Sequence, residues 1–378
     1  MDRVGYILAS FIYRAGNLSL RFFSSIFYRR LKKPVRTILI HRTGNLGDTF
    51  CAIPAIQALS GKFPAARLIL LTSVAEGASS HPPDVLEGIV DFDRCLIFKT
   101  SRLKEFSYRK DLIRKLRSEK VDLLAYFGFG VSFLRIFRDL LFYRLAGCRS
   151  AVGFRWFRHG FFRKAQLKHG RFANEVDRLM ESLRPLGIKS EEIGWEIPRP
   201  ARPVVFHSAD GPVIAVHPGA KFNVKKWPPR RFAEVIRTLE WQPEPLVIVI
   251  GGPGMEKEAE IVREAKPTGV INLQGRTDYL QLADLLSRCD LLLSADSGPV
   301  HVAAAVGTPV VALFGGRDYP GFWYPHGDRH LIIRADVECQ PCFLNDCPRV
   351  KCMEAITVAE VTRACRRLLK KAKPRTRP

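Results

Sequence analysis

The stretch "LLLSADSGPVHVAAAVGTPVVALFGG" (291–316) gathers polar and helix-opening residues after a short apolar run: Asp296, Ser297, Gly298, Pro299 and His301. Capping explains the first four, because Asp and Ser cap a helix, Gly turns and Pro opens it. Because a helix start also favours anions, Ser297 and Gly298 can hold a diphosphate. In that interpretation Asp296 accepts from a ribose hydroxyl or orients its neighbours, and His301 donates to a leaving phosphate oxygen. In the alternative, His301 is a core histidine.

A second candidate for phosphate binding is the loop in "VHPGAKFNVKKWPPRRFAEVI" (216–236). Lys221, Lys225 and Lys226 follow a His-Pro-Gly turn and come before Trp227 and two prolines that can open a helix. Ammonium groups beside free N–H groups at a helix start favour an anion. The alternative is a solvated basic loop.

A candidate general base lies in "ILIHRTGNLGDTFCAIPAIQAL" (38–59), where a strand leads through a glycine-containing loop to Asp48. Gly44 and Gly47 allow the backbone to approach a ligand closely. The loop lacks the GxGxxG dinucleotide pattern and no acidic residue ends the next strand, so we exclude a nicotinamide cofactor. We predict that Asp48 is the base at the carboxyl end of this strand, and the alternative is a helix cap.

Glu256 follows three glycines in "VIGGPGMEKEAE" (249–260), at the start of a predicted helix. A carboxylate there can accept a hydrogen bond from a base or a ribose. It can equally complement the positive end of the helix dipole, so both interpretations stay open.

Four of the nine cysteines lie within 14 residues: Cys339, Cys342, Cys347 and Cys352. Four thiolates can bind zinc or an iron–sulfur centre, although the spacing matches neither a zinc ribbon nor a ferredoxin. A disulfide or a plain thiol loop is the other interpretation. The remaining five cysteines are scattered and are predicted to be reduced.

These loops follow short β-branched runs that alternate with longer amphipathic ones, which is typical of βα units in a parallel sheet. The expected strands are "TILIH", "RLILLT", "CLIF", "DLLAY", "VIAVHP", "LVIVIGG", "VINL", "LLLSAD" and "PVVALFG". The expected helices lie near 49–59, 102–117, 133–145, 174–186, 229–239, 255–264, 279–288 and 300–305. We predict two doubly wound α/β domains, over 36–198 and 213–368, joined by a proline-rich linker over 199–212 and followed by a basic tail over 369–378. Ligands bind outside the carboxyl ends of strands in such sheets, and the candidate site residues follow strands.

The composition is that of a folded protein with a strong excess of positive charge. The 378 residues are 47% hydrophobic and 26% charged, with 60 Lys and Arg against 37 Asp and Glu, a formal net charge of +23. This charge favours anionic partners such as nucleic acid, acidic lipid or phosphorylated ligands. A nucleic-acid-binding function would depend on the charge alone, because no reading motif is present, so we expect no nucleic-acid partner.

Residues 1–35 are predicted to form a basic amphipathic segment that associates with a membrane. The ten uncharged residues "VGYILASFIY" are too few to span a bilayer, and no signal cleavage site follows them. On a helix one apolar stripe forms from Val4, Leu8, Phe11, Ala15, Leu18, Phe22 and Ile26, with arginines largely away from it. Such a helix lies in the interface of an anionic membrane, which predicts a cytoplasmic protein at the inner face of the inner membrane. The alternative is a helix packed on the protein's own core.

From Arg36 to Val361 the chain resembles family 9 glycosyltransferases, the ADP-heptose:lipopolysaccharide heptosyltransferases. The resemblance is carried by "TGNLGDTFCAIPAIQAL", "HPGAKFNVKKWP", "LQGRTDYLQLADLLSRCDLLLSADSGPVHVAAAVGTPVVALFG" and the late cysteines. It implies a GT-B fold of two Rossmann-like domains facing a cleft, with an ADP-heptose donor in the C-terminal domain and a lipid-linked inner-core acceptor in the N-terminal one. It also implies inverting transfer without a catalytic metal. Another nucleotide sugar, or an inactive glycan-binding protein of this fold, are the alternatives.

The resemblance assigns roles to individual residues. Asp48 is similar to the catalytic base and Lys225 to the lysine that holds the donor diphosphate. The other donor-binding positions are Glu256, Thr277, Asp296, Ser297, Gly298 and His301, and the loop residues around the base are Gly44, Asn45 and Gly47. Gly44 and Asn45 stand where some members carry serines. The N-terminal extension is not part of the family pattern either.

Overall fold

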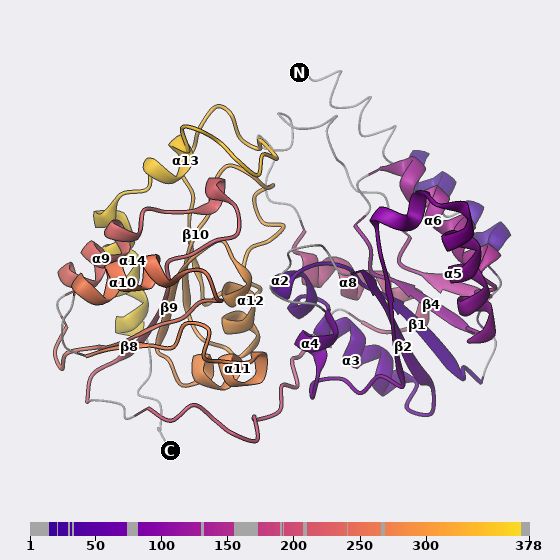
Figure 1. Cartoon of the computed structure of the whole chain (residues 1–378), viewed down its shortest axis with the longest axis horizontal. Coiled ribbons are helices and arrows are strands. Elements are labelled where there is room, and N and C mark those ends of the chain that lie inside the picture. The colour runs from indigo at the N-terminus through magenta and orange to yellow at the C-terminus, as the bar shows by residue number, and fades with distance from the viewer. Residues whose placement is uncertain are drawn as a thin grey trace. The chain divides into compact units, whose positions relative to one another are not determined.

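The computed structural model describes residues 15–20, 22–28, 31, 34–73, 82–129, 132–154, 173–189, 191, 193–206, 210–239, 241–265 and 269–371. The chain divides into two compact units, Met1–Glu196 and Ile197–Pro378, and each is described by itself (Figure 1). The division lies just before the predicted linker. No described helix is both long and apolar enough to cross a membrane.

The first unit contains a parallel five-stranded sheet in the order β3-β2-β1-β4-β5. Its strands are β1 (Thr37–His41), β2 (Arg67–Ser73), β3 (Arg94–Phe98), β4 (Leu123–Tyr126) and β5 (Ser150–Val152). The described helices are α2 (Leu46–Phe50), α3 (Ile53–Lys62), α4 (Pro82–Leu86), α5 (Phe106–Ser118), α6 (Phe133–Leu145) and α8 (Glu175–Ser182), with 3-10 turns η1 (Ser101–Lys104) and η2 (Arg184–Leu186). Every residue of β1 is buried, as expected for a central parallel strand covered on both faces.

The second unit contains a parallel six-stranded sheet in the order β11-β10-β9-β6-β7-β8. Its strands are β6 (Val213–His217), β7 (Leu246–Val249), β8 (Val270–Asn272), β9 (Leu291–Ala295), β10 (Val310–Leu313) and β11 (Leu331–Ile333). Its helices are α9 (Pro229–Thr238), α10 (Glu256–Ala265), α11 (Tyr279–Ser287), α12 (Gly298–Ala305), α13 (Lys351–Glu354) and α14 (Val358–Lys371), with a 3-10 turn η4 (Asn223–Lys225). Counted along each unit, both sheets have the strand order of a Rossmann-like fold.

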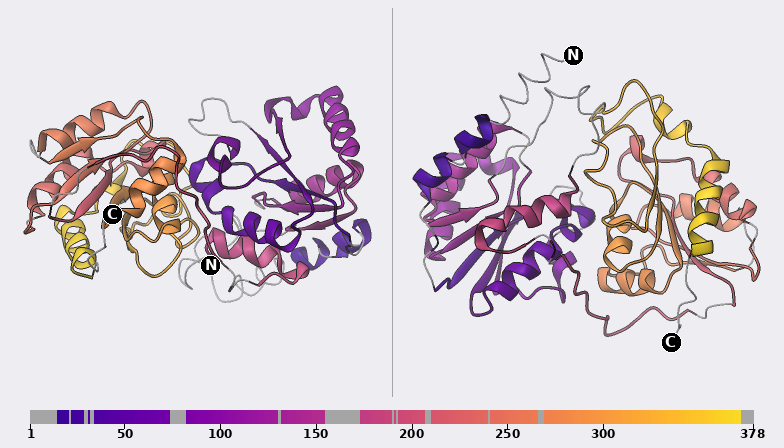
Figure 2. Two further views of the ribbon diagram at one scale, coloured as in Figure 1. Left: turned by 90° about the horizontal axis from the view of Figure 1, so that it is seen from below. Right: turned by 180° about the vertical axis from the view of Figure 1, so that it is seen from behind.

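Helices cover both faces of each sheet (Figure 2). In the second unit α9, α10 and α14 pack on one face through a core that includes Trp227, while α11 and α12 cover the other face (Figure 1). In the first unit α5 and α6 pack on one face, together with the helical residues 15–20 and 22–27. The predicted strands are all present, whereas β5 and β11 were not predicted.

The predicted helix over 49–59 is wrong in its continuity, because the segment forms two helices. α2 ends at Phe50 and α3 begins at Ile53 with Pro54 in its first turn. Proline lacks the N–H that would continue the hydrogen-bond ladder, so the helix restarts there. At the C-terminus, α14 continues to Lys371, into the segment predicted as a tail, and residues 372–378 lie outside the described part.

The described N-terminal helical residues pack partly on the protein's own core, as the alternative interpretation expected, and membrane association stays a prediction. Leu20 and Tyr28 are buried in the core of the first unit, where the Tyr28 hydroxyl donates to the Leu140 carbonyl at 2.8 Å. On the same helix, large apolar side chains are exposed at Leu18 (68%), Phe22 (61%) and Ile26 (59%). These are three members of the predicted stripe; Val4, Leu8 and Phe11 lie outside the described residues.

Candidate active site

The start of α12 joins two strand ends of the second unit. Ser297 is the N-cap of α12 and Gly298 its first residue, directly after β9. The Ser297 hydroxyl lies 3.0 Å from Nδ1 of His217, the last residue of β6. Burial lowers the pKa of His217 to about 4, so its ring is neutral at pH 7. The N–H groups at the start of α12 suit an anionic ligand.

Lys225 reaches this corner from the loop after β6. Its Nζ lies 2.8 Å from Oδ2 of Asp296 and 3.2 Å from Oδ2 of Asp318. Arg317 in turn lies 2.7 Å from Oδ1 of Asp318. Burial disfavours the charge on Lys225, but the Asp296 and Asp318 carboxylates outweigh it and raise the pKa of Lys225 above its ordinary value. The structure therefore brings together two predicted residues that are far apart in sequence, and holds the lysine as a cation.

His301 lies in α12, one turn beyond Gly298, and is buried. Its ring meets that of Trp323 edge to face, with centroids 6.2 Å apart. The structure thus places His301 one turn into α12 and packs it as a core histidine would be packed, and its role towards a phosphate stays a prediction.

Glu256 and Thr277 belong to two other loops at the carboxyl end of this sheet. Glu256 is the first residue of α10 and exposed, and it accepts from the Gly254 amide at 2.8 Å. That bond lowers the pKa of Glu256. Thr277 is half-buried, next to Asp278, which caps α11. Glu256 therefore lies in the first turn of α10, where the alternative interpretation has it complement the helix dipole, and its role towards a donor stays a prediction, as does that of Thr277.

The cysteine segment packs against the lysine loop. The Asn223 side chain pairs with the backbone of Cys347, accepting from its N–H at 2.9 Å and donating to its carbonyl at 3.3 Å. The Cys342 amide donates to the Gly316 carbonyl at 2.9 Å. The nine cysteines form no disulfides, and among the described residues no three His, Cys, Asp or Glu side chains lie together as metal ligands. The visible role of the segment is to hold the turn that carries Lys225.

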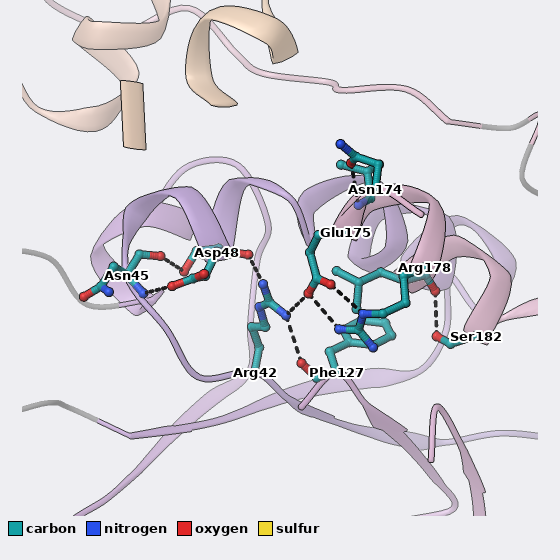
Figure 3. A network of polar contacts seen from close by, with 11 residues as sticks. Arg42, Asn45, Asp48, Phe127, Asn174, Glu175, Arg178 and Ser182 are labelled. Atoms are coloured by element: carbon teal, nitrogen blue, oxygen red, sulfur yellow. Dashed lines mark hydrogen bonds and ion pairs between the residues drawn. The ribbon is translucent and has the colours of Figure 1, made fainter. Parts of the chain in front are cut away.

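The candidate base lies in the first unit, on the short helix α2. Asp48 is the third residue of α2, and its Oδ2 accepts from the Asn45 amide at 2.7 Å (Figure 3). Asn45 is the N-cap, so Asp48 is not the cap itself but completes a capping box. Gly44 has φ +140°, and a Cβ there would lie 2.5 Å from the Asp48 Cβ. The glycine therefore makes room for the carboxylate, which folds back over the loop; Gly47 is buried behind it.

Sequence reasoning missed several charged residues around both loops. Asp318 and Arg317 follow β10, so the rule of strand carboxyl ends could have found them. Arg42 directly follows β1, is fully buried and pairs with Glu175 at 2.9 Å. An arginine in the apolar stretch at the end of a strand could have indicated a buried charge, but its partner Glu175 is 133 residues away in the sequence.

With this geometry in place, comparison with known proteins decides the family. A model of glycosyltransferase family 9 (heptosyltransferase) matches residues 140–353, more than half of the chain. The chain belongs to this family. It is 24% identical over 341 residues to lipooligosaccharide heptosyltransferase 2 of Campylobacter jejuni, which covers 88% of this chain and 98% of that relative.

Solved structures agree on the fold. A family 9 glycosyltransferase from Veillonella parvula matches with a TM-score of 0.64 at 20% identity, over 89% of this chain and 98% of that one. An E. coli heptosyltransferase with ADP-2-deoxy-2-fluoro heptose matches with a TM-score of 0.59 at 17% identity, over 88% of this chain and 99% of that one. The predicted GT-B class, with two Rossmann-like domains, and the predicted class of enzyme, a glycosyltransferase, are confirmed.

Proposed function

We propose that this family 9 chain transfers a heptose from ADP-heptose to the lipopolysaccharide inner core or a related glycolipid, with inversion at the anomeric carbon. Family membership supports the reaction class, and the relative solved with an ADP-heptose analogue supports the donor. The observation that carries the proposal is the Lys225 ammonium 2.8 Å from Asp296, beside the start of α12. A buried cation and a helix N-terminus together suit a diphosphate leaving group.

In the proposed reaction Asp48 takes the proton from an acceptor hydroxyl while the hydroxyl oxygen attacks the anomeric carbon. The bond from that carbon to the phosphate oxygen breaks, and ADP leaves with the electron pair. Lys225 and the N–H groups at Gly298 stabilise the charge that develops on ADP, a contribution of a few kcal/mol for each donor. We propose that they take the part of a catalytic metal.

A thermal-shift screen of the full chain with ADP-, UDP- and GDP-sugars tests the donor. ADP-heptose should raise the melting temperature of wild type and of Lys226→Ala, whose lysine is half-exposed and pairs with Glu258 at 3.2 Å. Lys225→Ala should abolish that shift. A shift with UDP- or GDP-sugars alone would contradict the donor. A shift without transfer to any inner-core acceptor would point to a glycan-binding protein, and transfer by Asp48→Ala would exclude Asp48 as the base.

We further propose that the protein works at the cytoplasmic face of an anionic membrane, where a lipid-linked acceptor is presented. The exposed side chains Leu18, Phe22 and Ile26 support this, because the helix packs on the core through its other face. Apolar side chains beside basic ones bind the interface of an anionic bilayer.

Vesicle co-sedimentation of the full chain tests the membrane proposal. Anionic phosphatidylglycerol vesicles should bind the wild type, and pure phosphatidylcholine vesicles should bind it far less. Replacing Leu18, Phe22 and Ile26 together by Gln should weaken binding at least tenfold. Val205→Gln is the control, because Val205 is 81% exposed and lies in the second unit. Equal binding by the triple variant and the control would overturn the proposal.

A further inference from the structure

A buried charge network lies directly behind the loop of the candidate base (Figure 3). The Arg42 guanidinium is fully buried, and its Nη1 donates to the Phe127 carbonyl and to Oε1 of Glu175, each at 2.9 Å. Its Nη2 donates to the backbone carbonyl of Asp48 itself. One side chain thus joins the ends of β1 and β4 to α2 and α8.

Glu175 holds Arg42 in this orientation. It is the first residue of α8, it is fully buried, and its two oxygens also bind Arg178 one turn further along, at 2.5 and 2.7 Å. The Asn174 side chain caps α8 by accepting a hydrogen bond from the Val176 amide, which fixes the start of the helix at Glu175. Burial works against its charge, yet Arg178 and Arg42 together hold the pKa of Glu175 below its ordinary value.

The bond from Arg42 to the Asp48 carbonyl adds support that neither the helix propensity of α2 nor its capping box supplies. α2 has five residues, too few for a helix that is stable by itself. The carboxylate of Asp48 braces the loop from its N-terminal side through the Asn45 amide. Arg42 braces the same residue from the core side, through its carbonyl. The Asp48 backbone is therefore held from both directions.

We propose that Arg42 is a positioning residue for the Asp48 base, and that Glu175 and Arg178 orient Arg42 for this task. The proposal rests on the proposed function, because it assumes that Asp48 removes the acceptor proton. Transfer rates are sensitive to such positioning, since a displacement of about 1 Å can cost about 100-fold in rate. If the network only stabilised the domain, substitutions in it would lower the free energy of unfolding and leave kcat of the folded enzyme unchanged.

Steady-state kinetics of the full chain at a temperature well below unfolding distinguish these roles. Arg42→Gln and Glu175→Gln should each lower kcat at least tenfold, while donor affinity by thermal shift stays within twofold of wild type, because the donor residues lie in the other unit. Arg42→Lys keeps the charge but cannot make the forked contacts, so it should restore only part of the rate. Arg178→Lys is a milder variant for use if Glu175→Gln fails to fold.

The first unit offers a matched control in Glu119. Its carboxylate is also buried and paired with two arginines, Arg94 at 2.5 Å and Arg67 at 3.5 Å. These arginines begin β3 and β2, at the opposite end of the sheet from Asp48. Glu119→Gln should lower stability, although less than Glu175→Gln because its two arginines are half-exposed, and should leave kcat unchanged. Equal kcat values for the two variants would overturn the positioning proposal.

Amide hydrogen exchange separates this proposal from the proposed function. Arg42→Gln should speed exchange at least tenfold across residues 45–50, and Glu119→Gln should not. If the wild type transfers no heptose, the proposed function fails, and the exchange result still decides whether Arg42 fixes the α2 loop. Unchanged exchange in Arg42→Gln would overturn the positioning role whatever the reaction.

Discussion

Gly44→Ala is the substitution that most directly tests the geometry of the base loop. The backbone φ of +140° is one that side chains rarely adopt, and forcing alanine into it costs roughly 1–3 kcal/mol. The new Cβ would lie 2.5 Å from the Asp48 Cβ, which is 3.4 − 2.5 = 0.9 Å short of ordinary contact. Asp48 must therefore move by nearly 1 Å, and we expect kcat to fall about 100-fold, or about 2.7 kcal/mol in activation free energy.

Heptosyl transfer and urea unfolding of the same preparations check this prediction. Gly61→Ala is the control, because Gly61 lies in α3 of the same unit, with ordinary φ and no atom within 4 Å of the added Cβ. Alanine there should leave kcat unchanged and raise stability by up to about 1 kcal/mol. A Gly44→Ala enzyme with kcat within threefold of wild type, or a Gly61→Ala enzyme equally impaired, would refute the reasoning.

Three further predictions concern stability and donor affinity. Burial lowers the pKa of His41 and of His217 from 6.5 to about 4. Between these values the unfolded chain binds more protons than the folded one, so the free energy of unfolding falls as the pH drops from 6.5 to 4. The expected loss is about 3 kcal/mol for each histidine. Urea unfolding at pH 7 and pH 4.5 should show this loss, and a pH dependence unchanged by His41→Gln would contradict it. Asn223→Ala removes both contacts with the Cys347 backbone, which hold the turn that carries Lys225, and should lower kcat/KM for the donor roughly 5- to 30-fold. An unaltered kcat/KM would show that these contacts do not position Lys225. Trp227→Phe removes the indole donor, now 3.1 Å from the Ile356 carbonyl, but that carbonyl keeps its bond from Arg231 at 2.9 Å. The unfolding free energy should therefore fall by about 1 kcal/mol, whereas an unchanged urea midpoint would show that the indole bond adds nothing.

Much of the fold was predictable because its signals are local. Each predicted strand is an apolar, β-branched run bounded by turn residues, and parallel strands buried on both faces need such runs. The helix start at Gly298 was predictable for the same reason, because Ser297 and Pro299 are adjacent capping and opening residues. The strands β5 and β11 were not predicted, and their length of three residues is not the reason, because β8 is equally short and was predicted from the run "VINL".

The contacts that set the candidate site were less predictable, because they join distant parts of the chain. Sequence pointed to Lys225 and Asp296 separately, as residues of two phosphate-binding loops. It could not show that Asp318 shares the lysine, or that Asn223 pairs with a backbone 124 residues away. Arg42 was passed over because a charged residue after a strand is usually solvated, and only the fold shows it buried against Glu175.

The positive charges around Lys225 are balanced by neighbouring carboxylates. Lys225 and Arg317 face Asp296 and Asp318, so two cations balance two carboxylates at the start of α12. The net charge of +23 is therefore not concentrated at this site. A neutral cluster can hold a buried lysine at low cost, and the helix start then supplies additional attraction for a diphosphate.

Part of the surplus lies on helices that share a core with the N-terminal helical residues. α5 carries Arg109, Lys110, Arg114, Lys115 and Arg117, and α6 carries Arg135, Arg138 and Arg144. Both helices pack on the same face of the first sheet as Leu20 and Tyr28, and Phe23 meets Phe137 of α6 with ring centroids 5.1 Å apart. The exposed stripe at Leu18 thus belongs to the most basic helical layer of its domain. Because donor binding draws on a balanced cluster in the other unit, salt should weaken membrane binding far more than donor binding.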